Sequence, residues 1–201
     1  MKKMTVLDRI LLFMTGLLAA YQIIVGVKGA VGLAAFAYTT AFGVLLIAGL
    51  LLIIFGFEVL ASPFVVIVAA IIPLSLAAGL VMQYLPAFGT MYLLFSVAGF
   101  FAIAITRFAT KGKLGTIVLA VVHGIAGLII FALPILLSLR GATPIGFALV
   151  GVGGALIGLG GLLLSFLKAG KPILSGKTIL AVLPTLLLLM TAAFVGGFAS
   201  T

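Results

Sequence analysis

Cysteine and tryptophan are absent from this chain of 201 residues, and acidic residues are almost absent. The lack of cysteine excludes disulfide bonds, thiolate catalysis, iron–sulfur ligation and cysteine-based zinc sites. Asp8, Glu58 and His123 are the only acids and the only histidine that could take part in acid–base or metal chemistry. A membrane enzyme normally shows at least two such groups that converge on its substrate. We therefore expect no catalytic residues, no metal site and no cofactor, and a protein that is not an enzyme.

Charge of either sign is also scarce. Charged residues make up 6% of the chain and hydrophobic residues 66%, whereas an ordinary soluble domain carries about 25% charged residues. So few charges cannot cover the surface of a soluble fold, and the composition predicts an integral membrane protein. The 11 lysines and arginines form no patch for nucleic acid. The segment AGKPILSGKT at 169–178 has five residues between its glycines, where a phosphate-binding loop needs four, so we expect no nucleotide either.

Long hydrophobic runs are what the sequence has in abundance. A membrane-spanning helix needs about 20 mainly apolar residues, and the connections between the runs are short. We predict one all-α transmembrane domain over residues 1–201, with seven transmembrane helices. The seven spans are 5–27, 34–59, 63–84, 88–108, 115–139, 144–167 and 177–199.

Signals for the ends of helices support these boundaries. The spacing Thr5-x-x-Asp8 is typical of a capping box at the start of the first span. A serine precedes Pro63 and a threonine precedes Pro144, which predicts that these prolines stand at the first positions of the third and sixth helices. Pro73 lies inside a span, where neighbouring helices in a membrane can tolerate it.

The basic residues are distributed unequally between the two ends of the predicted helices. Nine of them lie at the end that carries the N-terminus: Lys2, Lys3, Arg9, Arg107, Lys111, Lys113, Lys168, Lys171 and Lys177. Lys28 and Arg140 lie at the opposite end. The positive-inside rule then places the N-terminus in the cytoplasm and the C-terminus outside. We expect attraction to anionic lipid headgroups at the cytoplasmic face, and a location in the plasma (inner) membrane of a bacterium or archaeon.

Two helix ends share a sequence pattern. AAGLVMQYLP (77–86) and IAGLIIFALP (125–134) repeat Ala-Gly-Leu and Leu-Pro at the same spacing. The helices that run in the other direction share a small-Gly-apolar core at 47–52, 97–102 and 159–164. The pattern predicts three helix hairpins plus a single seventh helix, related as parallel repeats about an axis along the membrane normal.

Gly124, Gly127 and Pro134 end one helix as Gly-x-x-Gly-x6-Pro, and a glycine-bearing helix with a basic end follows. This pattern resembles the HdeD-like bacterial membrane proteins over roughly residues 63–168. The resemblance implies repeated helix hairpins, a link to acid-stress tolerance and no established catalytic site. The seventh helix departs from the family pattern.

The sixth span carries a stripe of small residues. Ala148, Gly151, Gly154, Gly158, Gly161 and Ser165 recur at steps of three and four. Such spacing places them on one helix face, and small residues allow helices in lipid to approach closely. We expect this stripe to be the contact with another helix, of this chain or of another one.

His123 lies about eight residues into its span, hence roughly 12 Å deep at 1.5 Å per residue. Zinc needs three or four protein or water ligands, and no second histidine or cysteine exists. We expect a neutral imidazole that is hydrogen-bonded to a neighbouring serine, threonine or carbonyl. A role as the single axial ligand of a cofactor shared with another subunit stays open.

Glu58 lies at the cytoplasmic end of the second span. A carboxylate at a helix C-terminus is disfavoured by the helix dipole, so a cationic partner is expected. Arg107 or Lys111, on the same side, is the predicted partner in an ion pair. A proton or cation gate is the alternative interpretation.

Three functions fit these features. We favour a structural or accessory subunit that packs against other membrane subunits or forms a homo-oligomer. A small-solute transporter or channel is the alternative, and an HdeD-like stress-associated protein is the third.

Overall fold

The computed structural model describes residues 3–109, 114–168 and 174–201, without the side chains of 162 and 165–168. The described part of the chain is helical throughout and contains no strand, as the sequence predicts. Three 3-10 turns lie between helices: η1 (Gly56–Ala61), η2 (Pro86–Phe88) and η3 (Ile145–Phe147). The seven described α-helices are α1 (Val6–Val25), α2 (Gly32–Phe55), α3 (Pro63–Tyr84), α4 (Gly89–Ala109), α5 (Leu114–Leu139), α6 (Ala148–Lys168) and α7 (Gly176–Ala199).

Six helical segments of the described chain are long and apolar enough to cross a membrane. They contain α1, α2, α3, α4, α5 and α7, while α6 contributes a shorter apolar stretch, Ile145–Gly161. The outer faces of the helices carry large apolar side chains, such as Ile24 at 83% and Leu139 at 72% exposure. A soluble protein rarely leaves extended apolar surface uncovered. These properties are those of a multi-pass membrane protein.

Two of the predicted boundaries are wrong, each for a local reason. The second helix ends at Phe55 and not near residue 59, because Gly56 adopts a φ of +71° and the chain continues as a 3-10 turn. Residues with a side chain rarely adopt a positive φ, whereas glycine does so without a steric penalty, so a glycine allows the chain to leave the α-helix at this point. The sixth helix begins at Ala148, because Pro144 is extended and is followed by the turn Ile145–Phe147. Pro63, by contrast, is the first residue of α3, as expected.

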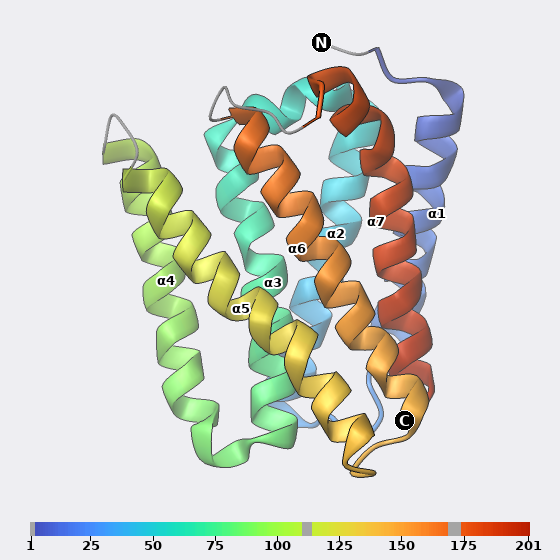
Figure 1. Cartoon of the computed structure of the whole chain (residues 1–201), viewed down its shortest axis with the longest axis vertical. Coiled ribbons are helices and arrows are strands. Elements are labelled where there is room, and N and C mark those ends of the chain that lie inside the picture. The colour runs from blue at the N-terminus through green and yellow to red at the C-terminus, as the bar shows by residue number, and fades with distance from the viewer. Residues whose placement is uncertain (1–2, 110–113, 169–173) are drawn as a thin grey trace.

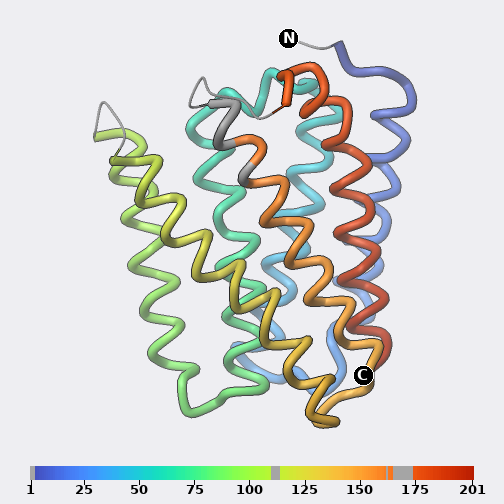
Figure 2. The backbone as a smooth tube through the Cα atoms, in the orientation of Figure 1, coloured from blue at the N-terminus to red at the C-terminus, as the bar shows by residue number. Residues whose placement is uncertain are grey.

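Consecutive helices run in opposite directions through one bundle (Figures 1 and 2). Six of them form a ring in which each contacts the next: α1, α2, α3, α5, α6 and α7, with α7 packed against α1. The remaining helix, α4, lies outside this ring against α3 and α5. In Figure 1, α5 crosses obliquely: it lies beside α6 where the two are joined and beside α4 at its own start. Helices α5 and α6 therefore diverge toward the end of the bundle that carries the N-terminus.

Aromatic residues fill the half of the bundle near the C-terminus. The ring of Phe198 lies 5.1 Å from that of Tyr38 and 6.1 Å from that of Phe147. Phe42 and Phe194 join the same cluster from α2 and α7, with ring centroids 6.5 Å apart. All five rings are at most 3% exposed. This half is closely packed, and the cavity described below lies toward the other half.

Candidate functional site

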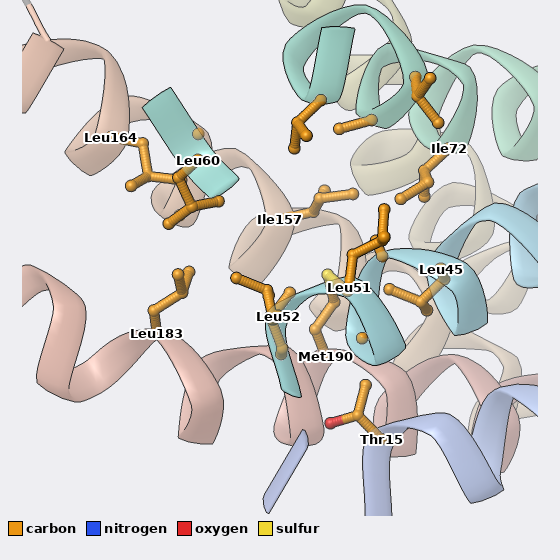
Figure 3. A pocket seen from close by; sticks show the side chains of 18 of the residues that line it. Thr15, Leu45, Leu51, Leu52, Leu60, Ile72, Ile157, Leu164, Leu183 and Met190 are labelled. Atoms are coloured by element: carbon orange, nitrogen blue, oxygen red, sulfur yellow. The ribbon is translucent and has the colours of Figure 1, made fainter. Parts of the chain in front are cut away.

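A cavity of about 310 Å³ lies between α2, α3, α6 and α7. Figure 3 shows side chains from these helices around the empty space, including Leu52 of α2, Ile72 of α3, Ile157 of α6 and Leu183 of α7. The turn η1, together with single residues of α1 and α5, completes the wall. The volume falls at the lower end of the roughly 300–1,000 Å³ that small-molecule sites occupy.

The wall of this cavity is almost entirely apolar. None of the described residues that line it is charged, and among them only Thr15 and His123 carry a side-chain nitrogen or oxygen. The hydroxyl of Thr15 donates to the carbonyl of Leu11 at 2.9 Å, within its own helix. The hydroxyl of Thr15 thus has its hydrogen-bond partner within α1. The other polar side chain among the described residues of the wall is that of His123.

His123 projects from α5 and lines the cavity. Its Nδ1 atom is buried and has no hydrogen-bond partner among the described residues. The hydrogen bond that the sequence predicts from a neighbouring serine, threonine or carbonyl is therefore not made at this atom. Buried polar atoms in folded proteins nearly always have a partner, so an unpartnered ring nitrogen in a residue that lines a cavity needs an explanation.

The cavity opens on the outer surface of the bundle between α3 and α6. Phe64 and Val68 of α3 line it and are 65% and 39% exposed. Gly161 of α6 also lines it and is exposed. Because these residues belong to the apolar flank of the bundle, the mouth faces the region that lipid chains would occupy.

The predicted glycine stripe of α6 explains why the cavity opens between α3 and α6. A Cβ added at Gly151 would lie 2.6 Å from the carbonyl oxygen of Phe131, and one at Gly154 would lie 2.8 Å from the amide nitrogen of Phe131. An added Cβ at Gly158 or Gly161 would meet nothing within 4 Å. The stripe therefore contacts α5 over its first two glycines and no longer touches it over the next two. Ala148 is partly buried, and the side chain of Ser165 lies outside the described residues.

A second glycine face of α6, which the stripe does not include, packs against α7. A Cβ added at Gly153 would lie 2.5 Å from the ring of Phe194, and one at Gly160 would lie 2.7 Å from Leu186. The spacing of seven residues between these glycines is a signal that the sequence contains. Sequence reasoning missed it because only the denser stripe was followed.

Glu58 and Arg107 are not brought together as an ion pair in the described part of the chain. Glu58 is exposed in η1, and the Nε atom of Arg107 is buried without a hydrogen-bond partner. The other predicted partner, Lys111, lies outside the described residues. Glu58 also does not line the cavity.

No group of three or more histidine, cysteine, aspartate or glutamate residues in the described ranges could hold a metal ion. The role of His123 as a single axial ligand of a shared cofactor stays a prediction.

Comparison with known proteins gives no match, whether with protein families, with curated proteins or with solved structures.

Proposed function

We propose that this chain is a non-catalytic integral membrane protein that binds an apolar molecule of the bilayer in the cavity between α2, α3, α6 and α7. The observation that carries this proposal is an uncharged cavity of about 310 Å³ with its mouth on the apolar flank of the bundle. A charged or strongly polar solute would lose its hydration on this wall without compensation. An apolar chain loses little on leaving the lipid and gains contacts with wall atoms that otherwise face empty space.

A matched pair of glycine variants tests the cavity. Gly161 lines the cavity, Gly127 of α5 does not, and an added Cβ meets nothing within 4 Å at either position. In nanodiscs, we expect 1-hexadecanol to raise the unfolding temperature of the wild type and of Gly127→Leu. Ligand at 100 times its Kd stabilises a protein by about 2.7 kcal/mol. The leucine of Gly161→Leu occupies the mouth, so this variant should show little or no rise.

The proposal fails if neither 1-hexadecanol nor hexadecane shifts the unfolding temperature of the wild type. It also fails if Gly161→Leu responds as strongly as Gly127→Leu, because binding would then occur elsewhere.

A second candidate function is that of an accessory subunit, and the free part of the α6 stripe favours it. Gly158 and Gly161 are exposed, and Leu159 beside them is 48% exposed. In lipid, such small residues let a second helix approach closely. We propose that a helix of another membrane subunit, or of a second copy, packs on this face.

If a helix packs on this face, Gly158→Leu should release a partner that the wild type retains in mild detergent. Migration of the wild type as a lone monomer would contradict it.

We further propose that the end carrying the N-terminus faces the cytoplasm of a bacterial or archaeal cell. Two described contacts place cations at opposite ends of the bundle. Arg9 donates from Nη1 to the carbonyl of Ile53 at 2.7 Å, at the C-terminal end of α2. Lys28 donates to the carbonyl of Thr201 at 2.8 Å, at the other end. The larger number of basic residues lies at the Arg9 end, which supports this orientation.

The parallel hairpin repeat, the transporter role and the HdeD-like stress role stay predictions. The apolar wall of the cavity supports neither proton nor ion coupling.

A further inference from the structure

Among the described residues of the cavity wall, one hydrogen-bonding side chain has a nitrogen without a partner. His123 lines the cavity, and its buried Nδ1 has no partner in the described structure. The residue as a whole is only partly buried. Rotation about the Cβ–Cγ bond of histidine has a broad, roughly two-fold profile. A half-turn of the ring exchanges the positions of Nδ1 and Cδ2, so Nδ1 can point to either side of the side chain.

Helix α3 lacks one of its α-helical backbone hydrogen bonds along the same wall. Pro73 lies inside α3 and lacks an N–H, so the carbonyl of Ala69 does not receive its α-helical donor from residue 73. Ala69 and Pro73 both line the cavity. The wall is therefore mainly apolar, but it contains an imidazole nitrogen without a partner and a helix that lacks one backbone hydrogen bond. Such a wall favours an occupant that is mainly apolar but carries a hydrogen-bonding group.

The chemistry of an imidazole selects the kind of group. A neutral imidazole has one N–H donor and one nitrogen acceptor, and a hydroxyl can satisfy either of them. An ether or ester oxygen can only accept. A carboxylate would bring a charge into a wall whose described residues include no cation, and the loss of its hydration would outweigh the free energy of one hydrogen bond. An alkane would leave the ring nitrogen unsatisfied.

We infer that the molecule held in this cavity is an uncharged long-chain lipid with a hydroxyl group, whose hydroxyl is hydrogen-bonded to the imidazole of His123. This inference rests on the proposed function and specifies the chemical class of its ligand. The chain of the lipid lies among the leucines and isoleucines of α2, α6 and α7. The hydroxyl lies at His123, on the α5 side of the cavity.

Affinities of three probes for the wild type in nanodiscs test the inference without any variant. The probes are 1-hexadecanol, its methyl ether and hexadecane, with palmitate as a charged comparison. We expect 1-hexadecanol to bind about tenfold more tightly than hexadecane, which is the factor that one net hydrogen bond supplies. We expect the methyl ether and palmitate to bind more weakly than the alcohol. Equal affinities for alcohol and alkane would overturn the role of the hydroxyl.

A substitution at His123 then assigns the hydrogen bond to this residue. His123→Phe keeps an aromatic ring and removes both nitrogens, so we expect it to lose the preference for 1-hexadecanol over hexadecane. His123→Gln, which restores a donor and an acceptor, should regain part of the preference. An undiminished preference in His123→Phe would overturn the assignment. If hexadecane and hexadecanol both fail to bind the wild type, the proposed function itself fails.

Discussion

At the scale of single residues, glycines on one face of α6 differ in what surrounds them. A Cβ at Gly154 would lie 2.8 Å from the amide nitrogen of Phe131 and 2.9 Å from the carbonyl carbon of Ile130. These are backbone atoms, which cannot move aside as the end of a flexible side chain can. At Gly158 the same Cβ would lie in open space. One helical turn thus separates a glycine that the packing requires from one that it does not.

This difference predicts opposite effects of the same substitution. Gly154→Ala should destabilise the protein, because α5 and α6 must separate, and overpacking typically costs about 1–3 kcal/mol. Gly158→Ala should be neutral or should stabilise the monomer by up to about 1 kcal/mol, since alanine is the better helix former. Unfolding of both variants in detergent, followed by circular dichroism, measures the difference. Equal losses at the two positions would contradict the packing described for α6.

At the scale of elements, α1 has the capping box that its sequence predicts. The amide of Asp8 donates to the hydroxyl of Thr5 at 3.1 Å, and the amide of Thr5 donates to the Asp8 carboxylate at 2.8 Å. The two bonds satisfy amide groups at the start of the helix that have no partner within it. The motif needs only neighbouring residues, which is why it can be recognised in the sequence.

Removal of this cap should weaken α1. We expect Thr5→Ala to lower the free energy of unfolding by about 0.5–2 kcal/mol, because Asp8 loses the hydroxyl that accepts from its amide. Thr5→Ser keeps that hydroxyl and should stay within a few tenths of a kcal/mol of the wild type. Chemical unfolding in detergent compares the two variants. A loss for Thr5→Ser as large as that for Thr5→Ala would show that the methyl group, and not the cap, matters.

The relation between α5 and α6 is the element-scale feature on which the cavity depends. The two helices touch at Gly151 and Gly154, next to the turn that joins them, and separate beyond Gly158. His123 lies in the diverging part of α5 and still lines the cavity. The oblique course of α5 thus leaves space between α3 and α6 that a parallel helix would fill.

At the scale of the whole molecule, the predicted orientation in the membrane can be measured with single cysteine substitutions, because the chain itself contains no cysteine. Ala142, in the α5–α6 connection, and Ser175, before α7, are both exposed. In intact cells, a membrane-impermeant maleimide should label Ala142→Cys and should label Ser175→Cys only after lysis. The physical reason is the excess of basic residues at the end near Ser175. The reverse pattern of labelling would place the N-terminus outside.

The number of helices and most of their ends follow from the sequence alone. Hydrophobic length, capping residues and prolines act over a few neighbours along the chain, and the cost of exposing backbone polar groups to lipid leaves little choice but a helix. The two misplaced ends, at Phe55 and at Ala148, lie beside 3-10 turns. The sequence does not distinguish such a turn from one more turn of α-helix.

The cavity and the surroundings of His123 were decided only by the tertiary structure. Both depend on the angle at which α5 crosses α6, and that angle results from contacts between residues far apart in the chain. The glycine stripe is continuous in the sequence, yet only its first two glycines contact α5. Composition and local spacing determine that this chain is a bundle of membrane helices. The direction in which each helix leans determines which faces meet, and therefore where the bundle leaves a cavity.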